Sequence, residues 1–456
     1  MSGELPWAIS RITVDRLFNL YSYELPPKSQ KADFSRVLIL YGDNGSGKTT
    51  ILQLLFHLLS PELRRGHKTF VARTMFQSIV VQFANGTTVS ATRETPRLGS
   101  FQMSVVSQDG LTSCLFEIDE KGIVPATPVR PDQLAVFRRL SELEIWFYFL
   151  SDNRKIQLSS SWLDISEAVE DEAFAYEEFL TRRRLYEEER ERPDSVDTLV
   201  TAAVDRTVEW LRQKVTQGSN VGAENANNIY IDIVQRIGKL PEKGTLEAGL
   251  SVQSITRSLK EAARRNESYA KFELTAPLDA RALVTALSKA PTRNKPVILS
   301  VLKPFVEGMN ARLDALSSIQ FLLETLLRSL NTFFIDKSIH FTLNAGFQIT
   351  SANGSVLKPS GLSSGEKHLL LMLCNSIMST GTRSVFIIDE PELSLNVKWQ
   401  RKLIPVLLEL SKHAAVQYIF ATHSIELLTN SLDNVVKLRT KLRNGRGNRR
   451  RAKAPR

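Results

Sequence analysis

Gly42-Asp43-Asn44-Gly45-Ser46-Gly47-Lys48-Thr49 fits the pattern G-x-x-x-x-G-K-[ST] at every fixed position of this 456-residue chain. The run before it, Val37–Tyr41, is short and apolar, which is typical of a buried strand in a mixed sheet. The segment after it, Thr50–Leu59, is apolar on most sides and predicts a buried helix. A glycine-rich turn between such a strand and helix indicates an α/β domain.

The composition of this turn is that of a phosphate-binding loop. Its glycines let backbone N–H groups wrap an anion, and the helix after it adds its positive dipole end. Lys48 can reach the β- and γ-phosphates of a nucleotide, and the Thr49 hydroxyl can ligate Mg²⁺. The expected nucleotide-binding residues are Gly42, Asp43, Asn44, Gly45, Ser46, Gly47, Lys48, Thr49 and Thr50. A chance glycine-rich turn is the alternative, which the flanking strand and helix disfavour.

A second hydrophobic strand, Val385–Ile388, ends in two carboxylates. Asp389 is the expected second ligand of Mg²⁺, as in nucleoside triphosphatases with a phosphate loop. Glu390 is the expected base that orients and activates water. By itself the pattern also fits a buried strand followed by an acidic loop, but its pairing with a phosphate loop favours the catalytic interpretation.

Two further segments can contact an anion. Leu362-Ser363-Ser364-Gly365-Glu366 precedes an apolar segment that predicts a helix, so its amides and hydroxyls form a second candidate anion site. An ordinary helix capped by Ser363 or Ser364 explains the same residues. His423 follows a short strand and lies one strand–helix–strand unit after Glu390, which places it at the same sheet edge. A structural histidine is the alternative there.

In this order, the four features resemble the ABC ATPase family, in its SMC, RecF and OLD branch. Gly42–Thr49 matches the Walker A motif, Leu362–Glu366 the signature, Val385–Glu390 the Walker B motif, Glu392–Asn396 the D-loop, and His423 the switch histidine. The resemblance implies ATP and Mg²⁺ as cofactors, and catalysis by Glu390, His423 and Lys48. It also implies two heads that meet head to tail, so that Ser363 and Gly365 contact the ATP of the other copy.

The match departs from the family pattern in two places. The signature has Ser364 where LSGGQ has its second glycine, and Glu366 where it has glutamine. The family's Q-loop has no clear equivalent. Its candidates are Gln77, Gln82, Gln157 and the Asp152–Arg154 turn.

The expected fold class is α/β: an ABC-type head with a mixed sheet flanked by helices, an antiparallel β lobe and a helical insertion. Asn85-Gly86 between two β-rich runs predicts a hairpin in the lobe. We expect four parts: residues 1–160 and 336–440 form the two halves of the head, 161–335 the helical insertion, and 441–456 a basic disordered tail. Within the insertion we expect a solvated charged segment at 167–192, a helix start at Ser195, and an Asn/Gly-rich loop at 219–228.

Net charge is the clearest feature of the composition. The chain carries 59 basic and 49 acidic residues, a formal charge of +10. Ten of the basic residues fall within 437–456, where there is no acidic residue, so the remainder of the chain is neutral. The tail could therefore contact nucleic acid non-specifically. With no long apolar run, no leader-like N-terminus and two cysteines, the sequence predicts a soluble cytoplasmic protein.

Features that the sequence lacks, compared with the families it resembles, narrow the function that the resemblance implies. After His423 only 33 residues follow, too few for the Toprim nuclease of OLD proteins. The chain is most similar to stand-alone ATPase subunits of anti-phage defence pairs, first that of PARIS and next that of Septu. Such a subunit senses a phage-encoded trigger and releases or activates a separate effector, here expected to be a Toprim nuclease. The alternatives are a RecF-like DNA-repair ATPase, which the basic tail favours, and an ATP-dependent scaffold with no nucleic-acid role.

Overall fold

A computed structural model describes residues 5–30, 33–62, 65–125, 129–159, 196–238 and 251–438, with side chains omitted from 219 to 238. The chain forms two compact units. The first comprises Met1–Thr181, Ser379–Leu408 and Ala414–Arg456, and the second Arg182–Met378 and Glu409–His413. Residues 336–378, which the expected domain bounds assign to the head, therefore cluster with the helical unit.

A six-stranded sheet in the order β15-β3-β14-β13-β8-β9 is the centre of the first unit. Its strands are β3 (Val37–Tyr41), β8 (Trp146–Leu150), β9 (Ile156–Ser159), β13 (Ser384–Asp389), β14 (Val416–Thr422) and β15 (Val435–Lys437). Neighbouring strands are parallel except β8 and β9. β13 and β14 are buried at every position, as expected of a parallel sheet covered on both faces.

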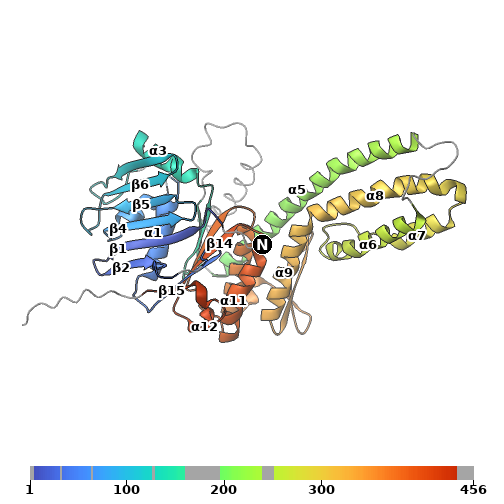
Figure 1. The fold of residues 1–456 in the computed structure, drawn as a ribbon. Helices are drawn as coiled ribbons and strands as arrows, with labels where there is room; N and C mark the ends of the chain where they lie inside the picture. The colour runs from blue at the N-terminus through green and yellow to red at the C-terminus, as the bar shows by residue number, and fades with distance from the viewer. Residues whose placement is uncertain are drawn as a thin grey trace, which may run out of the picture. The chain divides into compact units, whose positions relative to one another are not determined.

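The parallel strands bring three chemically important segments to one sheet edge. β3 ends at the phosphate loop, β13 at Asp389 and β14 at Thr422. Helix α1 (Lys48–Leu59) begins at the phosphate loop and packs against β8, β13 and β14. Helix α11 (Val397–Leu410) connects β13 to β14, and the short α12 (Ile425–Leu428) follows β14. Figure 1 shows α11 and α12 beside β14.

An antiparallel sheet in the order β2-β1-β4-β5-β6-β7 completes the first unit (Figure 1). Its strands are β1 (Ile9–Leu17), β2 (Tyr21–Leu25), β4 (Ser78–Phe83), β5 (Thr88–Thr92), β6 (Phe101–Ser107) and β7 (Gly110–Phe116). The predicted hairpin is confirmed, because β4 and β5 pair across Asn85-Gly86. The sequence did not indicate helices α2 (His67–Ala72) and α3 (Pro131–Ser141). Gln417 of β14 joins the two sheets through hydrogen bonds to both backbone groups of Ile9.

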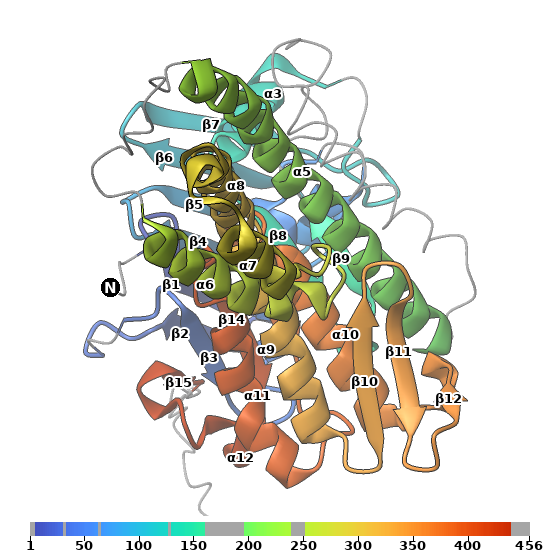
Figure 2. The ribbon, with the colours of Figure 1, turned by 90° about the vertical axis from the view of Figure 1, so that its right-hand side faces the viewer.

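The second unit combines long helices with a small sheet (Figure 2). The helices are α5 (Val196–Gly238), α6 (Val252–Ala270), α7 (Ala280–Lys289), α8 (Lys295–Ala315), α9 (Ser317–Phe333) and α10 (Ser364–Ser379). The antiparallel strands are β10 (Lys337–Thr342), β11 (Gly346–Ser351) and β12 (Val356–Leu357), and β10 packs on α9. Within its described residues, 3₁₀ turns at Thr292–Asn294 and Pro359–Gly361 lie in the connections of this unit, and Leu432–Asn434 forms one in the first unit.

The loop predicted at 219–228 is wrong, because α5 continues through it to Gly238. Glycine in a helix costs only about 1 kcal/mol relative to alanine, and this stretch has no proline to end the helix. Gly218, the residue just before the stretch, is required by packing. A Cβ atom there would come within 2.8 Å of the Leu316 side chain.

The fold class is confirmed as mixed α/β, with an antiparallel β lobe and a helical part. The charged segment 167–192, the helix start at Ser195 and the tail 441–456 lie outside the described residues. Within the described residues, no helix has both the length and the apolar character needed to cross a bilayer.

Candidate functional site

The phosphate loop has the backbone conformation that its glycines permit. Gly45 and Gly47 have φ values of 80° and 85°, in the left-handed region that glycine adopts most readily. A Cβ atom on Gly47 would also come within 2.9 Å of Leu17. The Tyr23 hydroxyl donates a hydrogen bond of 2.8 Å to the Ser46 carbonyl, which anchors the loop to β2. Both contacts come from neighbouring strands of the antiparallel sheet, β1 and β2.

Lys48 is the first residue of α1 and is only 5% exposed. Its ammonium donates hydrogen bonds to the carbonyls of Gly42 (2.9 Å) and Asp43 (3.2 Å). It also lies 3.7 Å from Oε1 of Glu390. The charge therefore faces the inside of the loop, where it adds to the positive end of α1 and favours an anion.

Asp389, the last residue of β13, is fully buried. Neither of its carboxylate oxygens accepts a hydrogen bond from the residues that the structure describes. Burial raises the pKa of Asp389 to about 6, although the nearby Thr49 hydroxyl opposes this shift. An orphaned buried carboxylate beside a threonine hydroxyl is an all-oxygen donor set of the kind that Mg²⁺ prefers. The two residues therefore fit the predicted metal ligands.

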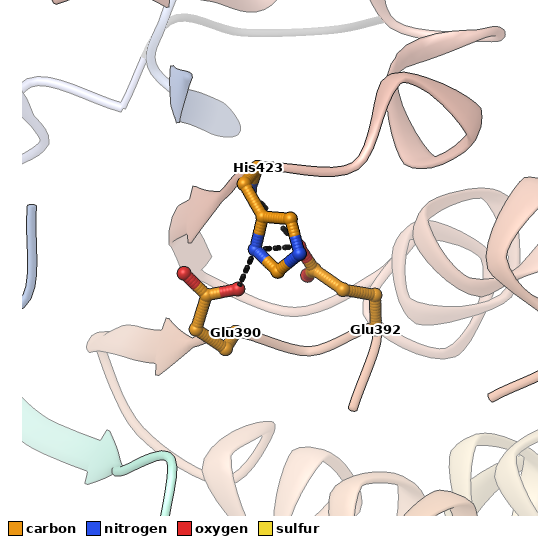
Figure 3. Close-up of side chains that lie close together, drawn as sticks. All are labelled: Glu390, Glu392 and His423. Carbon is orange, nitrogen blue, oxygen red and sulfur yellow. Dashed lines mark hydrogen bonds and ion pairs between the residues drawn. The ribbon is translucent and has the colours of Figure 1, made fainter. Parts of the chain in front are cut away.

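Glu390 and His423 face each other at the ends of β13 and β14 (Figure 3). Oε2 of Glu390 lies 2.5 Å from Nδ1 of His423. Burial and, to a lesser extent, the carboxylate of Glu392 raise the pKa of Glu390 to about 7, although His423 opposes the shift. Glu390 also has a left-handed backbone, with φ of 48°. A carboxylate whose pKa is near neutrality is suited to accept a proton from water.

In the sequence, Glu392 is notable only as part of the D-loop-like segment. In the structure this residue is 6% exposed and lies beside Glu390 and His423 (Figure 3). One of its oxygens, Oε1, lies 3.3 Å from Nδ1 of His423. The signal in the sequence was a third carboxylate two residues after Glu390, but only the fold shows what it contacts.

The signature-like residues belong to the second unit, where Ser363 caps α10. Its Oγ accepts a weak hydrogen bond of 3.4 Å from the Glu366 N–H, and Oε2 of Glu366 accepts one of 2.7 Å from the Ser363 N–H. This is a reciprocal capping box. The Lys337 ammonium bonds both oxygens of Glu366, at 2.8 and 3.1 Å. Ser363, rather than Ser364, is therefore the cap, and Gly365 lies in the first turn of the helix.

Among the Q-loop candidates, the Asp152–Arg154 turn reaches the edge of the sheet. The Arg154 guanidinium donates a hydrogen bond of 2.8 Å to the Ser394 hydroxyl. The Asp152 carboxylate contributes to the raised pKa of Asp389. Gln77 precedes β4, Gln82 lies on β4 and Gln157 lies on β9. The contacts favour the turn, and its role in nucleotide binding stays a prediction.

Comparison with protein families gives one match. Residues 227–429 match the AAA_21 family, described as "AAA domain, putative AbiEii toxin, Type IV TA system". The matched range includes Leu362–Glu366, Asp389, Glu390 and His423, and it begins after the phosphate loop. No curated protein matches the chain. Together with the phosphate loop, the family match supports an ATPase of the P-loop class.

Solved SMC heads are distant structural neighbours. An Smc head domain with an extended coiled coil, bound to the C-terminal domain of ScpA, from Pyrococcus furiosus, has 12% identity and a TM-score of 0.36, over 95% of this chain and 94% of that chain. An SMC head bound to the winged-helix domain of ScpA has 13% identity and a TM-score of 0.35, over 93% and 91%. The SMC head domain from Thermotoga maritima has 12% identity and a TM-score of 0.32, over 92% and 91%. Structural similarity this low assigns neither a family nor a function to the chain.

Proposed function

We propose that the chain binds ATP at the phosphate loop and hydrolyses it at the adjacent edge of the central sheet. One observation carries this proposal: Lys48, Glu390 and His423 come from three separate elements and meet at that edge. They supply a cation for the phosphates, a base with a pKa near 7 and a hydrogen-bond donor. Hydrolysis of a phosphoanhydride requires these three functions.

In the proposed reaction, water attacks the γ-phosphorus, and the bond from the γ-phosphorus to the β-phosphate oxygen breaks, giving ADP and phosphate. Glu390 accepts a proton from the attacking water. Lys48 turns from the loop carbonyls toward the β- and γ-phosphate oxygens, and His423 donates a hydrogen bond to the γ-phosphate. Thr49 and Asp389 would hold Mg²⁺, which supplies charge neutralisation at the same oxygens.

The signature-like segment acts, in this proposal, on the ATP of a second copy. Ser363 uses its Oγ as an acceptor in the capping box, so its hydroxyl proton remains available for a phosphate oxygen. The first-turn amides of α10, including that of Gly365, add the positive end of a 16-residue helix. Two copies arranged head to tail would then share two ATP molecules, and ATP would control their association.

We further propose that this switch serves anti-phage defence. The chain would hold a separate effector, for which a Toprim nuclease is our candidate, and release or activate it when a phage-encoded trigger appears. The description of the matched family, which names a putative toxin of a type IV toxin–antitoxin system, supports a role of this kind. The resemblance to the PARIS and Septu ATPase subunits supports the division between ATPase and effector chains.

A steady-state ATPase assay of purified protein tests the enzymatic proposal. Lys48→Ala should abolish ATP binding and turnover, because the loop loses its only cation among the described residues 42–49. Glu390→Gln should keep ATP binding and lower turnover by about 10²–10⁴-fold, as expected for loss of a general base. Lys28→Ala, at an exposed lysine of the same unit, is the matched control. Normal hydrolysis by Lys48→Ala would refute the phosphate-loop assignment.

Co-purification with the product of the adjacent gene, followed by phage challenge of cells carrying both genes, tests the defence proposal. A stable complex and protection that is lost in Lys48→Ala are expected. Absence of both the complex and the protection would exclude this role and leave the ATPase proposal intact.

The ten basic residues within 437–456 favour a second candidate, a RecF-like ATPase acting on DNA. Titration of the ATPase with duplex DNA at low salt separates the two. Stimulation that is lost when residues 441–456 are removed would favour the DNA-repair role. An ATPase that responds to neither DNA nor an effector would fit the third alternative, a scaffold.

A further inference from the structure

The loop that carries His423 is fastened by the carboxylate of Glu392. Oε1 of Glu392 accepts hydrogen bonds from the His423 N–H (3.0 Å), the Ser424 N–H (3.1 Å) and the Thr422 hydroxyl. Glu392 is 6% exposed, so these charge-assisted bonds form where water competes little. Three donors on one oxygen fix the backbone on both sides of His423.

Gln400 on α11 makes a second connection between this loop and the segment that contains Glu392. Its side-chain carbonyl accepts a hydrogen bond of 2.6 Å from the Ser424 hydroxyl, and its amide donates one of 2.8 Å to the Leu395 carbonyl. The segment 392–395 and the loop 422–424 are therefore joined at two points, once by Glu392 and once through Gln400.

Packing alone does not place the His423 ring, because its side chain is 47% exposed. The backbone of the loop therefore has to aim the ring at Glu390. Glu390, by contrast, directly follows the buried strand β13 and is 15% exposed. The 2.5 Å contact between the two thus depends on what holds the loop 422–424.

We propose that Glu392 and Gln400 are positioning residues, which hold His423 against Glu390 for ATP hydrolysis and leave ATP affinity unchanged. This inference rests on the proposed ATPase function. Gln400 acts through the Ser424 hydroxyl, and Glu392 through the loop backbone, the Thr422 hydroxyl and the His423 ring, 3.3 Å from its Oε1; neither needs to contact the nucleotide. The segment 392–395 and His423 are thereby held in a fixed position relative to each other.

The three side chains in Figure 3 are also of types that bind metal ions. The observed geometry favours a hydrogen bond instead. Two ligands of one zinc ion, each at about 2.0 Å, lie about 3 Å apart, whereas Nδ1 of His423 and Oε2 of Glu390 are 2.5 Å apart.

The test compares turnover, ATP affinity and the state of His423 in variants of the full chain. Glu392→Ala should lower kcat by about 10–100-fold, the usual range for loss of an orienting partner. The Kd for a fluorescent ATP analogue should stay within about threefold. Glu392→Gln keeps an oxygen acceptor at the same place and should recover kcat to within about fivefold. Gln400→Leu should lower kcat by about 3–10-fold.

An NMR measurement reports on the position of the loop independently of ATP hydrolysis. The chain has six histidines, so ¹⁵N-histidine NMR resolves few ring signals, and His423→Asn identifies the relevant one. Its Nδ1 signal should shift in Glu392→Ala and also in Gln400→Leu, where the lost contact is with the Ser424 hydroxyl and not with the ring. Glu426→Ala, which breaks an exposed ion pair with Arg401, is the matched control and should change neither kcat nor this signal.

Each outcome separates this inference from the proposed function. Unchanged kcat and an unchanged Nδ1 signal in Glu392→Ala would overturn the positioning role while the ATPase stands. Equal loss of affinity and turnover would also overturn it, because the effect would then be on binding. A wild-type chain that does not hydrolyse ATP would refute the proposed function, and the NMR arm would still decide the positioning. If Glu392→Ala does not fold, Gln400→Leu and Glu392→Gln carry the same comparison.

Discussion

At the scale of single residues, the site places two acids in succession at a position where burial disfavours their charge. Asp389 and Glu390 both have raised pKa values, about 6 and about 7, with burial as the leading cause. A strand that ends inside the molecule imposes this arrangement. This arrangement lowers the stability of the fold, but it serves the proposed function, since a base and a metal ligand both gain from weak solvation.

The pKa of Glu390 predicts a pH dependence. The carboxylate accepts a proton only when it is charged, so kcat/KM for ATP should rise with pH and level off above about pH 7. A profile of kcat/KM between pH 5 and 9 checks this. The Glu390→Asp variant serves as the comparison, and a flat wild-type profile down to pH 5 would argue against Glu390 as the base.

Asp389 predicts a pH-dependent change in stability. Its folded pKa of about 6 exceeds the ordinary value of 3.8, so the stabilisation present at low pH is lost as pH rises through about 6. Asp389→Asn removes this penalty and should raise the free energy of unfolding at pH 8 by about 1–3 kcal/mol in EDTA. The gain should shrink at pH 4.5. Thermal melting at both pH values measures it, and a lower melting temperature at pH 8 would contradict the assignment.

At the scale of elements, the start of α10 is the most informative case. The signature departs from LSGGQ by having Glu366, and the structure gives that residue two roles, in the capping box and in the ion pair with Lys337. Burial alone would raise the pKa of Glu366, but Lys337 and Ser363 together hold it below its ordinary value. The departure from the family pattern is thus compensated by a lysine on β10, 29 residues earlier.

Removal of this lysine should loosen the start of the helix. Lys337→Met should lower the free energy of unfolding by about 1–2 kcal/mol at neutral pH, because a largely buried carboxylate loses a charged partner. The effect should fade at acidic pH, where Glu366 becomes protonated. Lys358→Met, at an exposed lysine nearby, is the control in the same melting series. Equal stability of the two variants would show that the ion pair contributes little.

At the scale of the whole molecule, the head is assembled from distant parts of the chain. The phosphate loop and Glu390 are more than 300 residues apart in sequence, and Arg182–Met378 of the second unit stands between them in the chain order. A head-to-tail pair would add a further separation, because each site would take Ser363 and Gly365 from another copy. This arrangement makes a specific prediction for mixtures of defective chains.

Lys48→Ala and Ser363→Arg should each be inactive, for different reasons. In a mixed dimer, one site combines the intact loop of the Ser363→Arg copy with the intact signature of the Lys48→Ala copy. An equimolar mixture should therefore recover about a quarter of wild-type turnover, since about half of the dimers are mixed and each has one intact site. Mixing of separately purified variants with ATP, followed by a turnover assay, measures this. No recovery, with exchange verified by labelled chains, would refute action in trans.

The sequence by itself determined the features that depend on neighbouring residues. The phosphate loop, the apolar strands at 37–41 and 385–388 and the hairpin at Asn85-Gly86 follow from spacing and residue type, since local backbone chemistry fixes them. Tertiary structure decided the rest. The residue types at 219–228 indicate a loop, whereas in the fold α5 continues through them as part of a helix that packs against α8. The choice of Ser363 as the cap depends on the geometry of one turn. The pKa of Glu390 is raised chiefly by its burial at the end of β13. The hold of Glu392 on the His423 loop arises because two parallel strands end side by side, which brings together groups that the sequence separates by about 30 residues.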